Sequence, residues 1–337
     1  MYPLDRVDSG PTVRISNMRA ALAAIADLDV ISGYRARRSA ALARYAGSGR
    51  LRHLDGIYVE SSSALPSPAD LAFLGLARSL GIGVLTFVRD AYQLFPEYAA
   101  TTTKRRIAQR LFRPAMRGLM AVSSRVAFPS AGLAEALGAG RKTVLLPPGA
   151  PAPVDIPRTA DANQLLYVGA LGSETLGGQL LLAAVSLLRT RGDEPELICV
   201  TRSGEEPSGP HPDWLHLERA SAAGIHALLP PVVACIIPRR RSPYNDLAIP
   251  VKLMEYLSYG RPLVVTDCVE QARIVESSGA GLVVEDSVEA MADGIGRLLR
   301  AAPSYLDELS AAARAAAEAN SWRVRAHRVV AMLSAGA

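Results

Sequence analysis

Short runs of apolar and β-branched residues alternate along the chain with longer stretches in which apolar residues recur at a helical period. In the first half, such runs predict strands at residues 28–31, 57–59, 84–88, 122–128 and 143–146. In the second half, they predict strands at residues 165–168, 197–200, 214–217, 232–237, 263–266 and 282–284. Helical patterns lie between them, for example at residues 18–26, 69–80, 178–189 and 288–299. Continuous apolar strands separated by amphipathic helices predict an α/β fold with parallel sheets covered on both faces.

A proline-rich segment, Leu-Pro-Pro-Gly-Ala-Pro-Ala-Pro-Val at residues 146–154, is the sharpest break in this rhythm. Prolines lack a backbone donor and keep the chain extended, so this segment is interpreted as a semi-rigid linker. The expected parts are a first domain at residues 1–146, a linker at 147–160, a second domain at 161–319 and a C-terminal helix at 320–337. That amphipathic helix carries Trp322 and is predicted to pack back toward the first domain.

Composition narrows the class of protein. The 337 residues suffice for two domains of about 150 residues each. Hydrophobic residues make up 49% and charged residues 20%, which supports a large core and excludes wholesale disorder. Aromatic residues make up only 5%, too few for a base-stacking platform for single-stranded nucleic acid. The net charge of +5 suits an anionic ligand or membrane surface but is too small to imply DNA binding.

The ends of the chain and its cysteines indicate in which cellular compartment the protein is expected. Residues 1–11 are too polar and too short for the buried strand that usually opens an α/β domain, so either that strand is degenerate or the chain starts late. The sequence shows neither a signal-peptide pattern nor an apolar run of about eighteen residues. Cys199, Cys235 and Cys268 lie in or beside strand-like runs without a CxxC pair. Buried free thiols in a cytoplasmic protein are therefore expected.

The segment at residues 236–265 carries the chemistry that stands out most. It predicts a strand, a loop with the run Arg239–Arg241, a helix that begins near Pro250 and ends at Gly260, and a second strand. Loops at the carboxyl ends of parallel strands are where doubly wound folds bind ligands. The arginines and the free amides of the helix start suit a diphosphate. Lys252 and Glu255, three residues apart, share one helix face, where they can meet a phosphate and the two hydroxyls of a ribose.

Both features also have simpler interpretations. The pair Lys252 and Glu255 could be solvated on a surface helix, and Arg239–Arg241 could form a solvated turn. Lysine supplies only 3 of the 37 basic residues, so a lysine at this position is unexpected by chance. The position of the arginines directly after a buried strand favours anion binding.

The same segment resembles the nucleotide-sugar site of retaining GT-B glycosyltransferases of family 4. The phrase Pro-Val-Lys-Leu-Met-Glu-Tyr-Leu-Ser-Tyr-Gly-Arg-Pro-Leu-Val-Val at residues 250–265 looks like that family's signature. Residues 166–169, 279–284 and 287–292 follow the rest of its donor domain, and residues 87–97 are similar to an acceptor-side loop. The resemblance implies two Rossmann-like doubly wound parallel-sheet domains facing a cleft. It also implies that Glu255 holds the donor ribose and that the sugar is transferred with retention.

The sequence departs from that family at three positions. A second glutamate of the family, eight residues before the ribose-binding one, is replaced by Leu247. Its arginine and lysine after the first donor-domain strand appear as Ala170 and Leu176. Each charge-assisted hydrogen bond is worth about 1.5–3 kcal/mol, so two uncompensated losses would weaken donor binding by orders of magnitude. We expect Arg202 and the arginine run to compensate.

These residues make up the predicted site. A leaving diphosphate needs its developing charge neutralised, and without a metal-ligand cluster in the sequence this task falls to cationic side chains and helix amides. No metal or other cofactor is expected, and the nucleotide diphosphate-sugar is a co-substrate. The predicted catalytic residues are Asp90, Arg89 and Lys252, where Asp90, alternatively a cap for its turn, contacts the acceptor or the donor sugar. The predicted donor-binding residues are Glu255, Arg239, Arg240, Arg241, Tyr244, Pro250, Val251, Gly169 and Arg202.

The sequence indicates the acceptor less specifically than it indicates the donor. Residues 104–117 carry six basic residues and no acid, with Ile107, Leu111 and Phe112 on another face. Such a helix can lie on anionic lipid, so a glycan or lipid-linked acceptor at the inner membrane face is one hypothesis, and a merely exposed basic helix is the other. Two further functions stay open: a catalytically silent GT-B protein that binds or regulates a partner, and a nucleotide-sugar epimerase or hydrolase. No nucleic-acid partner is expected.

Overall fold

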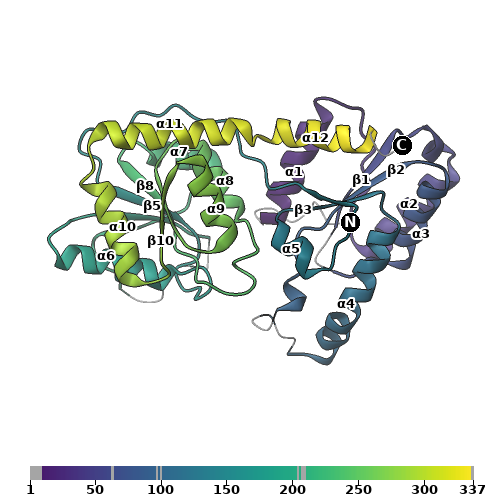
Figure 1. Ribbon diagram of the computed structural model, residues 1–337, viewed down its shortest axis with the longest axis horizontal. Helices are drawn as coiled ribbons and strands as arrows, with labels where there is room; N and C mark the ends of the chain where they lie inside the picture. The colour runs from purple at the N-terminus through teal and green to yellow at the C-terminus, as the bar shows by residue number, and fades with distance from the viewer. Residues whose placement is uncertain are drawn as a thin grey trace. The chain divides into compact units, whose positions relative to one another are not determined.

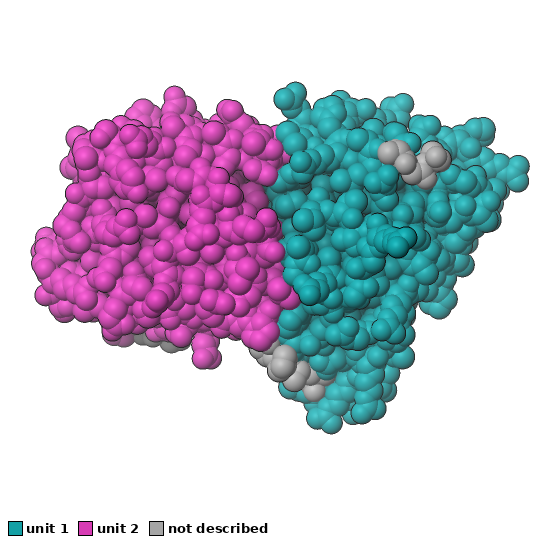
Figure 2. Space-filling view, viewed as in Figure 1, with its two compact units in different colours: residues 1–149, 322–337 teal, residues 150–321 magenta. Residues whose placement is uncertain are grey.

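The structure is a computed structural model that describes residues 10–61, 64–95, 98, 101–202, 205 and 210–334. The chain forms two compact units (Figure 2). Unit 1 comprises residues 1–149 and 322–337, and unit 2 comprises residues 150–321. Within the described residues, no helix is both long and apolar enough to cross a membrane.

Unit 1 contains a parallel sheet of four strands in the order β1-β2-β3-β4. The strands are β1 (Gly56–Glu60), β2 (Gly83–Phe87), β3 (Arg125–Phe128) and β4 (Thr143–Leu145). Successive strands are joined through α3 (Pro68–Ser79), α4 (Thr103–Ala121) and α5 (Ala131–Ala136). The remaining elements are α1 (Gly10–Ala23), α2 (Arg35–Gly47), the short 3-10 helices η1 (Arg50–His53) and η2 (Tyr92–Leu94), and α12 (Trp322–Ser334).

The two faces of this sheet are covered by different helices. On one face, apolar residues of α3, α4 and α5 pack against alternate strand residues such as Val84 and Val126. On the other face, α1 and α12 lie side by side (Figure 1) and pack against Leu85, Phe87 and Ala127. Trp322 opens α12 inside this second core, so the last helix belongs to unit 1 although α11 before it belongs to unit 2.

The strand predicted at residues 28–31 is absent from the structure, and this prediction was wrong. Leu28 and Val30 are exposed, at 39% and 47%, instead of entering a core. Asp29 between them accepts hydrogen bonds from the Tyr45 hydroxyl (2.5 Å) and from Arg50 (2.8 Å), which ties the segment to α2 and η1. An apolar run becomes a strand only when a neighbouring strand satisfies its backbone, and none of the described strands pairs with this segment.

Unit 2 contains a parallel sheet of six strands in the order β10-β9-β8-β5-β6-β7. The strands are β5 (Gln164–Val168), β6 (Glu196–Val200), β7 (Leu215–Glu218), β8 (Val232–Ile237), β9 (Leu263–Thr266) and β10 (Gly281–Val284). The helices are α6 (Gly178–Thr190), α7 (Ala222–Leu228), α8 (Val251–Ser258), α9 (Val269–Ser278), α10 (Val288–Leu299) and α11 (Pro303–Ala319). The direction in which strands are added reverses between β5 and β8, as in the Rossmann fold.

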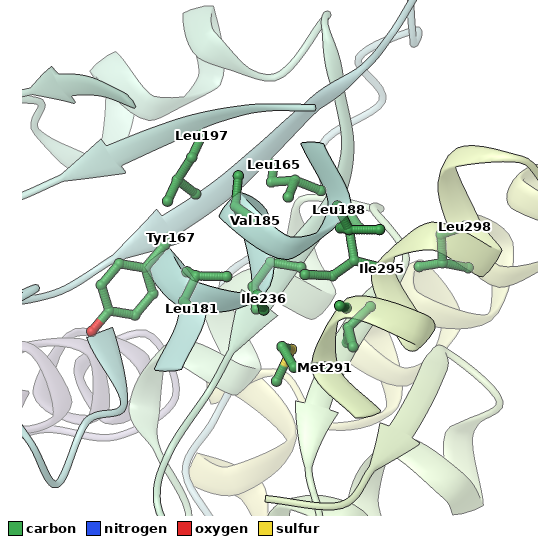
Figure 3. Packing of buried hydrophobic residues seen from close by; sticks show 14 of the residues in the cluster. Leu165, Tyr167, Leu181, Val185, Leu188, Leu197, Ile236, Met291, Ile295 and Leu298 are labelled. Atoms are coloured by element: carbon green, nitrogen blue, oxygen red, sulfur yellow. The ribbon is translucent and has the colours of Figure 1, made fainter. Parts of the chain in front are cut away.

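Helices cover both faces of this sheet, as the apolar strands predicted. On one face, α6 and α10 supply residues such as Leu181, Val185, Met291 and Ile295 to a core shared with the strands (Figure 3). On the other face, α7, α8, α9 and the second half of α11 pack against residues of β8 and β9. Cys199, Cys235 and Cys268 are buried and free, which confirms the expectation of unpaired thiols.

The proline-rich segment is bound to unit 2. The Val154 amide donates to the Ser258 carbonyl (2.8 Å), and Arg261 donates to the Ile156 carbonyl (3.0 Å). Val154 and Ile156 also pack against the core on that face. The structure divides the chain after Gly149, whereas a linker had been expected at residues 147–160. Most of the expected linker therefore contributes to unit 2, because its apolar side chains and its carbonyls find partners there.

Candidate donor site

The place where the strand order reverses in unit 2 is built from two loops in close contact. Gly169 follows β5, and Pro238 follows its neighbour β8. Gly177 has φ +74°, and a Cβ there would lie 1.6 Å from the Pro238 carbonyl oxygen, so only glycine fits. The Thr175 carbonyl also accepts a hydrogen bond from the Asn245 side-chain amide (3.1 Å). The β5–α6 loop and the β8–α8 loop are thus held together at the sheet's carboxyl edge, where doubly wound folds bind ligands.

The helix α8 begins at this edge. Pro250 is the residue immediately before Val251–Ser258, one position earlier than the first helical turn where the sequence had placed it. No side chain caps the helix start among the described residues, and Gly260, with φ +60°, follows its end. One face of α8 enters the core through Leu253, Met254 and Leu257. Lys252 and Glu255 occupy the other side and are both only partly exposed.

Two side chains of α8 bind the last residue of β5. The Val168 amide donates to the Tyr256 phenol oxygen (2.7 Å), and the Lys252 ammonium donates to the Val168 carbonyl. Tyr256 is buried, so this bond lies inside the core, whereas Lys252 lies at its border. In the sheet, β5 is the neighbour of β8, the strand that precedes α8 in the chain. The bonds to Val168 therefore hold the start of α8 over the ends of both strands.

Burial perturbs both ionisable groups of the pair. Loss of hydration lowers the pKa of the Lys252 ammonium from its usual value, and the nearby positive charge of Arg202 acts in the same direction. Burial raises the pKa of the Glu255 carboxyl, while the charge of Lys252 opposes that rise. Two perturbed groups of opposite charge at the ligand-binding edge of an α/β sheet mark a candidate functional site on physical grounds. The surface-pair interpretation of Lys252 and Glu255 does not fit this burial.

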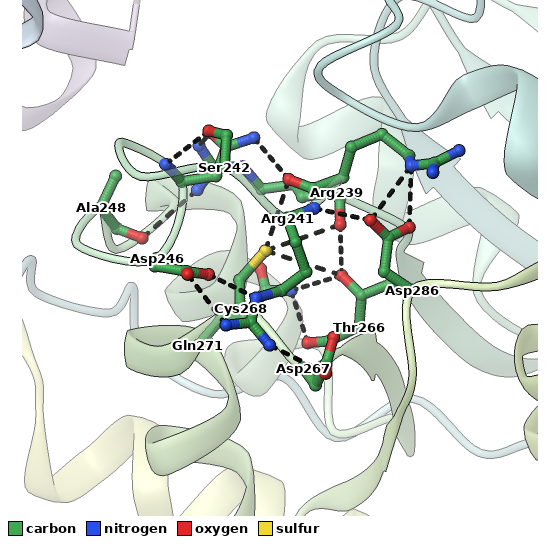
Figure 4. Close-up of polar contacts among 12 residues, drawn as sticks. Arg239, Arg241, Ser242, Asp246, Ala248, Thr266, Asp267, Cys268, Gln271 and Asp286 are labelled. Carbon is green, nitrogen blue, oxygen red and sulfur yellow. Dashed lines mark hydrogen bonds and ion pairs between the residues drawn. The ribbon is translucent and has the colours of Figure 1, made fainter. Parts of the chain in front are cut away.

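The arginine run after β8 is arranged differently from the expectation. Arg239 is buried at 9% exposure and turns inward, where it donates to the Asn245 side-chain oxygen and to the Ala248 carbonyl (3.3 Å). Its own carbonyl accepts from the Thr266 hydroxyl (2.5 Å). Arg239 therefore shapes the β8–α8 loop from within (Figure 4).

The other two arginines are paired with acids from neighbouring strand ends and from their own loop, and Figure 4 shows the contacts of Arg241. Arg240 forms an ion pair with Asp286 (2.8 Å). Arg241 donates two hydrogen bonds to Asp246 (2.7 and 2.9 Å) and one to Asp267 (2.9 Å). These contacts raise the pKa of Arg241 above its usual value. Three carboxylates thus face the two guanidinium groups.

The structure pairs Arg240 and Arg241 with acids of unit 2 and turns Arg239 inward onto neutral oxygens, so donor binding by the arginine run stays a prediction. Sequence analysis missed these acids. Asp267 directly follows β9, and Asp286 comes two residues after β10, so both lie at the carboxyl edge shared with β8. Adjacent strand ends in a parallel sheet meet at one edge, and this rule could have identified them.

The other predicted donor residues surround the same loops. Gly169 is buried directly after β5, and its amide donates to the Val200 carbonyl (3.0 Å). Tyr244 is partly buried in the β8–α8 loop, where its carbonyl accepts from the Leu247 amide (3.1 Å). Arg202, after β6, is exposed and pairs with Glu205 at 3.8 Å. Its charge acts on Lys252, so it lies in the neighbourhood expected for a compensating cation.

The predicted acceptor-side residues lie in unit 1. Arg89 and Asp90 come just after β2 at the carboxyl edge of its sheet, and they pair with each other at 2.9 Å. Both side chains are largely buried, at 12% and 14% exposure. Of the acceptor-side loop predicted at residues 87–97, positions 96 and 97 lie outside the described residues. Across the described parts of both units, no cluster of three or more His, Cys, Asp or Glu residues is arranged to hold a metal ion.

Comparison with known proteins fits this geometry. A family model described as "Glycosyl transferases group 1" matches residues 162–301, which include β5 to β10 and the whole candidate donor site. The matched residues lie within unit 2. No curated protein sequence matches the chain.

Solved structures share the fold of this glycosyltransferase chain. A UDP-forming α,α-trehalose-phosphate synthase from Burkholderia xenovorans, in complex with glucose-6-phosphate, is 12% identical with a TM-score of 0.58, covering 89% of this chain and 78% of that one. A sucrose-phosphate synthase from Thermosynechococcus elongatus is 16% identical with a TM-score of 0.60, covering 98% and 94%. A glycosyltransferase from Rickettsia africae is 13% identical with a TM-score of 0.62, covering 92% and 84%. The predicted GT-B fold and glycosyltransferase class are thus confirmed.

Proposed function

We propose that this chain transfers a sugar, with retention, from a nucleotide diphosphate-sugar to a glycan or lipid-linked acceptor. The observation that carries the proposal is the partly buried pair of Lys252 and Glu255 at the start of α8, in the glycosyltransferase domain and at the point where strand order reverses. A buried pair of opposite charge costs hydration energy, and a site that binds charged and hydroxylated ligands offsets that cost.

The chemistry assigned to the pair follows from charge. When the glycosidic bond breaks, negative charge grows on the diphosphate, and a cation held next to it lowers the barrier. Lys252 and the uncapped amides at the start of α8 supply that positive charge. Glu255, ionised, accepts hydrogen bonds from both ribose hydroxyls. Asp90 and Arg89 contact the acceptor or the transferred sugar from unit 1.

Relatives of the same fold support a nucleotide-sugar donor. The trehalose-phosphate synthase from Burkholderia xenovorans is UDP-forming, and one from E. coli was solved with UDP-2-fluoro glucose. Gly169, Tyr244, Pro250 and Val251 would contact the nucleotide through backbone and ring atoms, because they line the loops around α8. Arg202 supplies a second, exposed cation.

The helix α4 supports an acceptor at the inner face of a membrane. Its buried side, with Phe112, Met116 and Leu119, packs into unit 1. Ile107 and Leu111 are exposed, at 54% and 49%, one turn apart on the opposite side. The six basic residues Lys104, Arg105, Arg106, Arg110, Arg113 and Arg117 are all exposed. An apolar ridge surrounded by cations is the chemistry that anionic lipid recognises.

Flotation with vesicles of phosphatidylcholine and phosphatidylserine, compared with vesicles of phosphatidylcholine alone, tests the membrane contact. We expect the wild type to float and the double variant I107D/L111D to remain at the bottom. L76D, which alters an exposed leucine of α3, is the matched control and should float like the wild type. Equal flotation of all three proteins, or of none, would remove the membrane from the proposal.

A combined thermal-shift and hydrolysis screen against UDP-, GDP-, ADP- and dTDP-sugars tests the central function. We expect one nucleotide to raise the melting temperature of the wild type and one of its sugars to be hydrolysed slowly. Glu255→Ala should lose both signals while unfolding cooperatively. Transfer or hydrolysis that survives this substitution undiminished would contradict the site.

A catalytically silent binding protein is the second candidate, and the acid-paired state of Arg240 and Arg241 favours it. In that case a nucleotide sugar would shift the melting temperature without being consumed, with or without added acceptor glycans.

A further inference from the structure

A cavity lies beside β1, which is the edge strand of the unit 1 sheet and pairs only with β2 among the described strands. Its volume is about 270 Å³. The strand β1 lines it over its whole length, from Gly56 to Glu60, and residues 27–32, which we call the outer wall, line it too. This is the segment that carries a strand-like sequence but pairs with none of the described strands. We call this cavity the edge slot.

Helices close the edge slot above and below. Met18 and Leu22 of α1 line it from one face of the sheet, and Phe73 and Leu74 of α3 line it from the other. The bidentate ion pair between Arg38 of α2 and Asp70 of α3, at 2.8 Å for both bonds, fixes the helices on that second face. The slot therefore has the surroundings of a strand position inside a covered parallel sheet, with a backbone edge on one side and helices on both faces.

The backbone of β1 is oriented to accept a strand there. The Ser61 amide donates to the Phe87 carbonyl of β2, so the amides of Val59 and Ile57 also point toward β2. Alternation along a strand turns the amides and carbonyls of Gly56, Tyr58 and Glu60 the other way, into the edge slot. Exposed strand edges of this kind are templates for adding another strand.

We propose that the edge slot binds an extended, apolar segment of a partner polypeptide, which adds to β1 as a parallel strand. The partner is a polypeptide because only a regular row of amides and carbonyls matches the row presented by β1. It is apolar because the faces of the slot carry Met18, Leu22, Phe73 and Leu74, and charged residues of the lining such as Asp29, Glu60 and the pair Arg38–Asp70 already have partners within unit 1. Leu28 and Val30, exposed on the outer wall, would be covered by the added strand. This surface is separate from the donor site and does not depend on the proposed transferase activity.

A labelled peptide tests the proposal on the full chain. The probe carries the sequence of residues 83–88, which is the strand that pairs in parallel with the other edge of β1, between solubilising lysines. Fluorescence anisotropy measures its affinity, and residue-resolved hydrogen exchange follows the amides of Tyr58 and Val59. We expect saturable binding and at least tenfold slower exchange at Tyr58, with no change at Val59, which already bonds to β2.

Two substitutions and a second peptide distinguish strand addition to β1 from non-specific binding. Val30→Asp should weaken binding at least tenfold, because it replaces an apolar side chain of the outer wall by a carboxylate that has no cation of its own there. Leu76→Asp, an exposed leucine of α3 outside the slot, should leave the affinity within twofold. A peptide with proline at its central position should not bind, because proline cannot donate to the ladder. Equal losses in both variants, binding of the proline peptide, or no binding at millimolar concentration would each overturn the proposal. Strong protection of Tyr58 before any peptide is added would do so too, since the chain would then fill the slot itself.

Discussion

The arginine run after β8 and the pair of Lys252 and Glu255 on α8 belong to one strand–loop–helix segment, yet the structure treats their charges in opposite ways. Arg240 and Arg241 reach acids that come from the ends of β9 and β10 and from their own loop. Lys252 instead bonds to a neutral carbonyl and faces a carboxylate three residues away. A run of cationic residues in a sequence therefore does not by itself provide positive charge for a ligand, because acids within the protein can neutralise it.

Exposure separates the two groups further. The Arg241 side chain is 42% exposed, so its ion pairs are screened by solvent and contribute to local order more than to ligand binding. Lys252 is partly buried and its pKa is lowered by that burial, which makes its charge costly to maintain and strong in its effect on a bound anion. We therefore propose that Lys252 acts on the donor and that Arg240 and Arg241 have a structural role.

The largest effect is expected at Lys252. Replacing it by methionine removes a charge-assisted bond to the leaving diphosphate, worth about 1.5–3 kcal/mol, so kcat for sugar transfer or donor hydrolysis should fall by about 10–100-fold. Lys142→Met is the matched control, because Lys142 also donates to a backbone carbonyl, that of Ser123 (2.9 Å), but in unit 1. Equal losses in the two variants would assign the Lys252 effect to stability.

Replacing Glu255 by glutamine should mainly affect donor binding. The amide keeps the shape but loses the charge that accepts both ribose hydroxyls, so the donor KM should rise by about tenfold or more, with a smaller change in kcat. Steady-state kinetics at several donor concentrations separates the two parameters. A KM equal to that of the wild type would remove Glu255 from the ribose site.

The pH profile should show both perturbed groups. In the proposed mechanism, binding requires an ionised Glu255 and a protonated Lys252. The pKa of Glu255 is raised by burial, so activity should begin to fall on the acid side at a higher pH than an ordinary glutamate would cause. The pKa of Lys252 is lowered by burial, so the alkaline fall should come below the range of an ordinary lysine. In E255Q the acid limb set by this group should disappear from the profile of kcat/KM, and an unchanged acid limb would assign it to another group.

A smaller and different effect is expected at Arg241. Arg241→Ala breaks its bonds to Asp246 and Asp267, both at a partly exposed site, and should lower the free energy of unfolding by about 1 kcal/mol. Chemical denaturation measures this loss. Donor KM should change by less than about threefold, since one screened guanidinium whose charge is already balanced contributes little to a ligand.

The smallest effect is expected at Arg202. Its pair with Glu205 is long, at 3.8 Å, and its side chain is 59% exposed. Arg202→Ala should therefore raise donor KM by no more than about threefold at low salt, and the difference should vanish near 0.5 M salt because exposed charges are screened. A tenfold effect that persists in high salt would mean that Arg202 contacts the donor directly instead of acting as a screened surface cation.

Much of the fold could be predicted from the sequence because it follows from local patterns. Apolar runs such as those at 84–88 and 232–237 became β2 and β8, and the glycine at 260 ended α8. The strand predicted at 28–31 does not form, because a strand needs a neighbouring strand to pair with and sequence periodicity does not reveal that neighbour. The candidate pair Lys252 and Glu255 could be recognised in the sequence because both residues lie on one helix, and its role in the site stays a prediction. The acids that neutralise the arginines were missed because Asp267 and Asp286 come from strands distant in sequence and adjacent in space.

The most direct test of the central claim is calorimetric titration of a nucleoside diphosphate, taken from the positive hit of the nucleotide screen, into the wild type, E255Q and R241Q. The account predicts that E255Q weakens binding at least tenfold, while R241Q binds within threefold of the wild type despite its lower stability. If R241Q lost the nucleotide and E255Q retained it, the donor phosphates would be held by the arginine run, and the assignment of the site to the start of α8 would be wrong.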